Sequence, residues 1–174
     1  LDGRCRGGGL EFLLSFDMRF ATANSLIGFP ETAGGFLPCG GGTTRTLMMA
    51  GPAKAMEMIM AARDFTGEEA VALGLINRAF TDRAGLDAFV DALASSIGTR
   101  SWVSIEGVRA VLKNVFAPMA ETMFAGFAAE NDGLRAGQAT AEMQEGMRLH
   151  LEMGQTRERE LDLPGSMRAI TDGQ

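Results

Sequence analysis

Hydrophobic and polar residues follow one pattern in the first 45 residues and another in the rest. In the first part, short apolar runs are separated by loops rich in glycine and proline. Residues 18–22 alternate between apolar and polar and predict a strand, and residues 25–29 predict a second strand that Pro30 ends. The apolar run 10–14 predicts the start of a helix. We expect the two strands to need pairing partners that the sequence does not reveal.

Beyond residue 45 the pattern predicts successive helices, interrupted by one short strand or extended piece over residues 75–80. The helical spacing of apolar residues predicts one amphipathic helix over residues 84–97 and another over 103–115, which we expect to end before Pro118. Two further helices striped with methionine follow, and the charged residues from 155 onward are typical of a tail. The pattern therefore predicts an α/β front part and a helical remainder.

Four residues between positions 43 and 74 mark expected helix ends. Thr43 is placed to cap a helix that follows a glycine-rich loop, and Pro52 stands where a first-turn proline belongs. Thr66 opens a Thr-Gly-Glu-Glu capping box, and Gly74 is expected just past the end of the short helix that this box begins.

Composition and charge remove several classes of function. The net charge of −6 leaves no basic surface for nucleic acid or for an anionic membrane. No apolar run approaches the roughly 20 residues needed to span a bilayer. Cys5, Cys39 and the single His150 have no metal-binding spacing, so we expect no metal site. Two free thiols fit a reducing compartment, and we expect a cytoplasmic location.

The candidate chemistry lies in two carboxylates near glycine-rich turns. Glu11 follows a triple glycine and stands among apolar residues, and Glu31 follows another apolar stretch. A glycine turn that enters a helix offers free N–H groups to a phosphate or to an oxygen that becomes negative during a reaction. The turn fits neither the dinucleotide fingerprint nor the phosphate-binding P-loop. Taken singly, these features also fit a plain turn and plain loop carboxylates.

Their combination is more specific. The segments Gly-Gly-Gly-Leu-Glu at 7–11, Gly-Phe-Pro-Glu at 28–31 and Leu-Pro-Cys-Gly-Gly-Gly-Thr at 37–43 resemble the signature of the crotonase family, the enoyl-CoA hydratases and isomerases. Glu11 and Glu31 are 20 residues apart, which matches the hydratase pattern. The similarity continues to about residue 114.

This resemblance implies a fold, a substrate and a set of site residues. It implies a ββα spiral over residues 1–80, of which the chain holds the C-terminal part, a helical trimerisation region over 81–154 and a tail over 155–174. The implied partners are an acyl-CoA thioester and further copies of the chain in a homo-trimer or hexamer. No cofactor is implied, because coenzyme A belongs to the substrate.

The implied roles can be carried over residue by residue. Glu11 and Glu31 hold a water between them; one activates it for attack on Cβ and the other delivers a proton to Cα. The backbone N–H of Gly8 is one of two that hold the thioester oxygen. The other six expected residues line the substrate pocket: Gly7, Gly9, Phe29, Pro30, Gly34 and Pro38. The second N–H lies before Leu1 in the family, so we expect this chain to begin within a fold and not to form a complete active site alone.

Three alternatives to hydration stay open. A double-bond isomerase of the family needs only one base, commonly at the Glu31 position, so retention of Glu11 favours hydration. Other acyl-CoA reactions of the family reuse the same pocket. A non-catalytic acyl-CoA-binding or assembly subunit is a different class, and two retained carboxylates argue against it.

Overall fold

The computed structural model describes residues 1–154 of the 174-residue chain. Strands and short helices alternate up to Phe80, and from Arg83 the described chain is helical. The elements, in chain order, are β1 (Arg4–Arg6), α1 (Gly8–Leu13), β2 (Phe20–Thr22), β3 (Leu26–Gly28), the 3₁₀ helix η1 (Glu31–Gly34), α2 (Gly42–Ala50), α3 (Pro52–Ala61), β4 (Asp64–Thr66), α4 (Gly67–Ala72), β5 (Arg78–Phe80), α5 (Arg83–Gly98), α6 (Trp102–Gln138) and α7 (Ala141–Met153).

The strands form two small sheets. In the first, β3 pairs with β1 in parallel and with β4 antiparallel, so that Ile27 stands beside Cys5 on one side and Phe65 on the other. In the second, β2 pairs with β5 in parallel, with Ala21 beside Ala79. The expectation that the sequence holds no visible partners for the front strands is wrong, because β3 pairs with β1 and β4, and β2 pairs with β5. Three residues are too few for β4 to show an alternating pattern.

The hydrophobic core joins these two sheets to the helices packed on them. Phe29 and Phe65 are its largest side chains, and both are fully buried. The remaining members come from α1, α3, α4, the strands and the segment after α4: Leu10, Leu14, Ala21, Ile27, Met58, Ala70, Leu75 and Ile76. The core therefore fixes α1 and β3, the two elements that lead into the candidate site.

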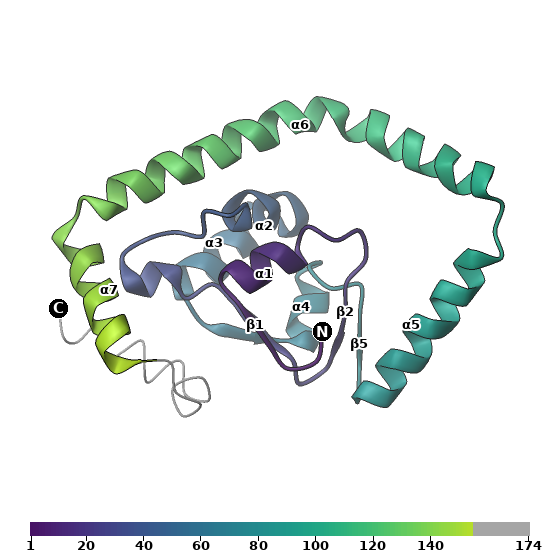
Figure 1. The fold of residues 1–174 in the computed structure, drawn as a ribbon, viewed down its shortest axis with the longest axis horizontal. Helices are drawn as coiled ribbons and strands as arrows, with labels where there is room; N and C mark the ends of the chain where they lie inside the picture. Colours follow the sequence, from purple (N-terminus) through teal and green to yellow (C-terminus); the bar gives the residue numbers. More distant parts are fainter. Residues whose placement is uncertain (155–174) are drawn as a thin grey trace.

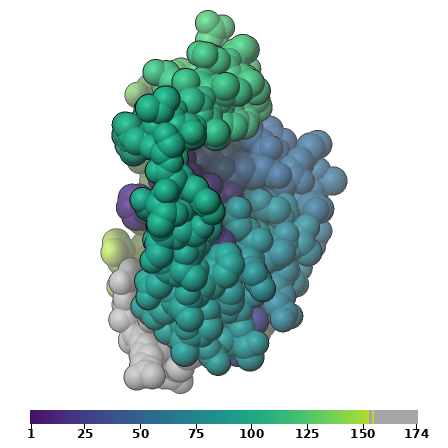
Figure 2. Space-filling model, turned by 90° about the vertical axis from the view of Figure 1, so that its right-hand side faces the viewer, coloured from purple at the N-terminus to yellow at the C-terminus, as the bar shows by residue number. Residues whose placement is uncertain are grey.

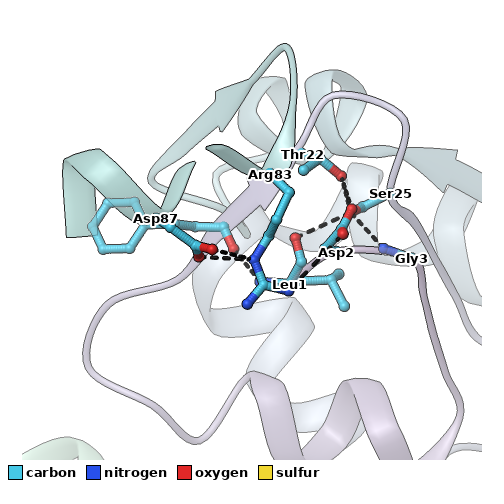
Figure 3. A network of polar contacts seen from close by, with 8 residues as sticks. Leu1, Asp2, Gly3, Thr22, Ser25, Arg83 and Asp87 are labelled. Carbon is cyan, nitrogen blue, oxygen red and sulfur yellow. Dashed lines mark hydrogen bonds and ion pairs between the residues drawn. The ribbon is translucent and has the colours of Figure 1, made fainter. Parts of the chain in front are cut away.

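A polar network around Ser25 ties the first residues to the turn between β2 and β3 (Figure 3). The buried Ser25 Oγ accepts a hydrogen bond from the Gly3 N–H at 3.2 Å and lies 2.8 Å from Thr22 Oγ1. The Thr22 hydroxyl in turn donates to Asp2 Oδ1 at 3.0 Å. Because Gly3 directly precedes β1, the network holds β1 in register with β3.

Helices α5, α6 and α7 form an arch around the strand-bearing part (Figure 1). Seen from the side, α5 and the adjoining part of α6 stand out as an arm with a recess beneath it (Figure 2). The predicted end of a helix before Pro118 is wrong, because α6 continues through this residue. A proline inside a helix removes one hydrogen bond at a cost of about 3 kcal/mol, and good helix formers on both sides continue the helix.

Three of the four predicted helix ends are confirmed. Pro52 lies in the first turn of α3, and Thr66 and Glu69 form both hydrogen bonds of the capping box of α4. Gly74 follows α4 with a positive φ of 81°. The cap at Thr43 is wrong: α2 begins at Gly42, and the Thr43 hydroxyl donates to the Pro38 carbonyl at 2.9 Å.

No helix within residues 1–154 combines the length and the hydropathy that crossing a bilayer requires.

Candidate active site

Parallel pairing of β1 and β3 brings the segments that follow them to one edge of the sheet. Arg6 at the end of β1 stands opposite Gly28 at the end of β3. Gly7 then donates its N–H to the Gly28 carbonyl at 3.0 Å and adopts a φ of +51°, a conformation that favours glycine. Helix α1 starts directly after β1 and η1 starts shortly after β3, so both begin at this edge.

Glu31, the first residue of η1, is buried behind Gly7. A Cβ on Gly7 would lie 2.7 Å from Glu31 Oε1, so a side chain there would force the Glu31 carboxylate to shift. Glu31 Oε2 is buried without a hydrogen-bond partner. Burial raises the pKa of Glu31 to about 7; a backbone N–H opposes this rise and the charge of Glu11 adds to it. A carboxyl group with this pKa gains and loses its proton around neutral pH.

Glu11 lies on α1 in a different environment. Its Oε1 accepts hydrogen bonds from the N–H groups of Gly40 at 2.6 Å and Gly42 at 3.0 Å. These amides belong to the start of α2, where free N–H groups and the helix dipole favour a negative charge. The two predicted catalytic carboxylates are thus electrostatically coupled, with Glu11 solvated by backbone amides and Glu31 largely desolvated.

Gly8 and Glu11 face the same open cavity of about 320 Å³. Gly8 is the first residue of α1, so its N–H has no acceptor within the helix. A Cβ on Gly8 would meet nothing closer than Glu11 Oε2, at 3.9 Å. The other lining residues come from α1, from the glycine segment and from α2: Phe12, Ser15, Gly40 and Arg45. The cavity therefore offers a backbone donor and a carboxylate to one small group.

None of the other expected pocket residues is among those that line this cavity. Phe29 and Pro38 are fully buried and pack behind Gly42, each 2.8 Å from where its Cβ would be, so they support the amides that hold Glu11. Pro30 precedes η1 as its N-cap. Gly34 lies against the Phe36 ring, and the Cβ direction of Gly9 points at Cys5 Sγ rather than at the carboxylates.

Sequence reasoning missed a third carboxylate near the same segment. Glu130 on α6 is only 2% exposed, and its two oxygens accept hydrogen bonds from the N–H groups of Gly41 and Thr44 at 2.7 and 2.6 Å. Along the sequence, Glu130 is 89 residues from Gly41 and 86 residues from Thr44. The available signal was a carboxylate one helical turn from glycine on both sides, at 126 and 133, which indicates a closely packed face.

The cysteines and the potential metal ligands have no part in the acid–base chemistry that the two carboxylates can perform. Cys5 and Cys39 are both free. Burial, followed by the charges of Glu11, Glu130 and Glu31, raises the pKa of the Cys39 thiol, so this group stays protonated and is a weak nucleophile. The described part of the chain contains no cluster of three or more His, Cys, Asp or Glu suited to a metal ion. General acid–base chemistry by two carboxylates is what the arrangement can perform.

Solved structures with the same fold support this description. A crystal structure from Streptomyces avermitilis, of a protein provisionally assigned as an enoyl-CoA hydratase, matches 99% of this chain and 61% of that one, with a TM-score of 0.89 and 34% identity. The structure of OdaA from Pseudomonas aeruginosa matches 84% of this chain and 58% of that one, with a TM-score of 0.73 and 27% identity.

Curated relatives include both hydratases and isomerases. The peroxisomal Delta(3,5)-Delta(2,4)-dienoyl-CoA isomerase of Arabidopsis thaliana is 32% identical over 64% of this chain and 40% of its own length. The mitochondrial methylglutaconyl-CoA hydratase of Rattus norvegicus is 44% identical over 44% of this chain and 24% of its own length. The chain thus spans less than half the length of each of these relatives.

The model of the family described as enoyl-CoA hydratase/isomerase matches residues 1–159. With the fold and the carboxylate-bearing edge of the sheet described above, this match shows that the chain belongs to the enoyl-CoA hydratase/isomerase family, the crotonases.

Proposed function

We propose that the protein is an enoyl-CoA hydratase that adds water reversibly to a 2-enoyl-CoA thioester. The observation that carries this proposal is the unequal pair of carboxylates: Glu31 has its pKa raised to about 7, while Glu11 accepts two backbone N–H bonds. Hydration of a conjugated thioester needs one group that accepts a proton from water and one that gives a proton to carbon. A pair of carboxylates in different environments supplies both roles.

In the proposed reaction, one water adds across the C=C bond of the thioester. Water adds its oxygen to Cβ as the new C–O bond forms, and Glu11 accepts a proton from it. The neutral Glu31 gives its proton to Cα, and the C=C bond becomes a single bond. The Gly8 N–H stabilises the thioester oxygen while negative charge collects there. One water is consumed, and the proton on Glu11 returns to Glu31 through the next water that enters.

The acyl-CoA substrate, the assembly and the location belong to the same proposal. A homo-trimer or hexamer is supported by the many exposed apolar side chains of α6, among them Trp102 at 67% and Val103 at 80% exposure. The division at residue 80 into spiral core and helical region remains a proposal, and the expected tail over 155–174 lies outside the described residues. A cytoplasmic location is also a proposal, since the relatives above are named as peroxisomal and mitochondrial proteins.

Isomerisation is the second candidate, because a dienoyl-CoA isomerase is among the relatives. It would use Glu31 to move a proton between carbons and would leave Glu11 idle. Binding without catalysis is a third, and the raised pKa of Glu31 argues against it, because a binding subunit has no use for a desolvated carboxylate.

Product analysis separates these candidates. The assay uses this chain and a version lengthened at its N-terminus, called here the extended chain. Crotonyl-CoA and a 3-enoyl-CoA are offered separately. Formation of 3-hydroxybutyryl-CoA from the first supports hydration, and conversion of the second to a 2-enoyl-CoA without water addition supports isomerisation. Tight binding of both thioesters without formation of either product would support the third candidate, a subunit that binds acyl-CoA without catalysis.

A further inference from the structure

Both oxygens of the buried Glu130 carboxylate accept hydrogen bonds from backbone N–H groups at the start of α2. Its Oε2 accepts the N–H of Gly41 at 2.7 Å and its Oε1 accepts the N–H of Thr44 at 2.6 Å. Both bonds are buried. A carboxylate at 2% exposure is tolerated only when its charge is compensated, and these two N–H groups at a helix start provide that compensation.

Glu130 and Glu11 hold the same glycine segment through different amides. The N–H groups of Gly40 and Gly42 donate to Glu11, while that of Gly41, which lies between them, donates to Glu130. The segment is therefore clamped between two carboxylates. Its position fixes where the amides that hold Glu11 point, so Glu130 acts on Glu11 through the backbone.

One face of α6 is fitted closely to this segment. A Cβ on Gly126 would lie 2.5 Å from Thr44 Oγ1, so α6 approaches α2 at a distance that only glycine permits. On the same face, the Phe127 ring lies 5.0 Å from the Arg45 guanidinium, whose Nη1 donates to the Gly40 carbonyl at 3.0 Å. The helix thus anchors the glycine segment through its carbonyl as well as its amides.

We propose that Glu130 is a positioning residue for hydration: it holds the segment 40–44 so that the Gly40 and Gly42 amides orient the Glu11 carboxylate. This inference rests on the proposed function for its effect on rate. In Glu130→Gln one oxygen remains as an acceptor, but an NH2 group now faces the other buried N–H, and the segment moves to relieve this donor–donor contact. A displacement of about 1 Å at a catalytic group costs roughly 100-fold in rate.

The kinetic test compares Glu130→Gln with wild type in the extended chain. We expect kcat for crotonyl-CoA to fall roughly 10- to 100-fold, and KM to change less than kcat, because the substrate does not touch Glu130. Glu130→Asp keeps the charge but shortens the side chain, and we expect an intermediate kcat. Glu121→Gln, the same change at an exposed position of α6, should leave kcat unchanged.

A stability control separates positioning from plain destabilisation. Leu86→Ala truncates a buried side chain of α5 without touching the segment 40–44. It should lower Tm and leave kcat at the wild-type value. Equal kcat losses in Leu86→Ala and Glu130→Gln at equal losses of Tm would overturn the inference, and so would an unchanged kcat in a folded Glu130→Gln variant.

An amide NMR measurement on the 174-residue chain tests the same inference without any activity. We expect Glu130→Gln to shift the Gly40 and Gly42 amide resonances in the direction that Glu11→Gln shifts them, with Phe65 unmoved as a core reference. Movement of Gly41 and Thr44 alone would overturn the inference. If wild type hydrates nothing while Gly40 and Gly42 still respond to Glu130, the proposed function fails and the positioning role stands. If Glu130→Gln does not fold, the same Gly40 and Gly42 amide resonances are measured in Glu130→Asp, and the same criteria apply.

Discussion

The Glu31 carboxylate lies directly against Gly7: a Cβ at Gly7 would be 2.7 Å from Glu31 Oε1. Gly7 also has a φ of +51°, so both its backbone conformation and its contact with Glu31 disfavour a side chain at this position. The contact joins the start of α1 to the start of η1 and so fixes the buried carboxylate beside the helix that carries Glu11.

Gly7→Ala should therefore damage both stability and activity. The positive φ alone costs about 1–3 kcal/mol for a residue with a side chain, and the clash with Glu31 adds to it. Urea unfolding of the 174-residue chain measures the loss. Gly8→Ala is the matched control, because its Cβ meets nothing within 3.9 Å and its stability should stay near wild type. Equal stability of the two variants would contradict the assigned contact.

The pKa of Glu31 predicts how stability depends on pH. Folding raises this pKa from 4.5 to about 7, so between these values the folded state binds more protons than the unfolded state. The contribution of Glu31 to the free energy of unfolding is therefore fully present below pH 4.5 and is lost as pH rises through 7, by about 3 kcal/mol in all. Glu31→Gln should be more stable than wild type above pH 7, and the difference should shrink towards pH 4.5.

Denaturant unfolding at several pH values tests this expectation. Glu121→Gln, an exposed carboxylate on α6, serves as the control and should follow wild type throughout. A constant difference between Glu31→Gln and wild type from pH 4.5 to 8 would mean that Glu31 does not titrate near 7.

The same titration should govern the rate of hydration. If Glu31 gives its proton to Cα, kcat/KM for crotonyl-CoA falls about tenfold per pH unit above pH 7, where the free enzyme loses this proton. The descending limb should be absent from the residual activity of Glu31→Gln. A wild-type profile that stays flat from pH 6 to 9 would contradict the role of Glu31 as the acid.

Gly8 is predicted to serve through its N–H group, and substitution can test this without unfolding the site. Gly8→Val places methyl groups in the cavity beside that N–H and should lower kcat roughly 100-fold, the loss typical of one oxyanion donor. Gly8→Ala leaves the cavity more open and should retain most of the activity. Wild-type kcat in a folded Gly8→Val variant would remove Gly8 from the thioester site.

Local signals in the sequence predicted local structure well. The capping box at Thr66 needs only four residues in order, and the strand over 25–29 needs only apolar residues ended by Pro30; both are present in the structure. Features that depend on distant parts were missed. Strand β4 takes its pairing from β3, and the start of α2 is capped by Glu11 and Glu130 instead of Thr43.

The candidate site shows the same limit. The roles of Glu11, Glu31 and Gly8 came from a resemblance to a family. In the fold, Gly8 and Glu11 line one cavity, and Glu31 lies buried against Gly7, outside the lining of that cavity. The difference between the two carboxylates could not be read from the sequence, because it depends on which amides surround each one. The role of Glu130 could not be predicted for the same reason, because only the packing of α6 on α2 brings Glu130 to the segment 40–44.

The most direct test is hydration of crotonyl-CoA by the extended chain, measured as loss of the conjugated thioester absorbance, for wild type, Glu11→Gln and Glu31→Gln. The account predicts that wild type forms 3-hydroxybutyryl-CoA and that each variant is slower by about 10²- to 10⁴-fold while remaining folded. A wild-type rate in either variant would contradict the two-carboxylate mechanism.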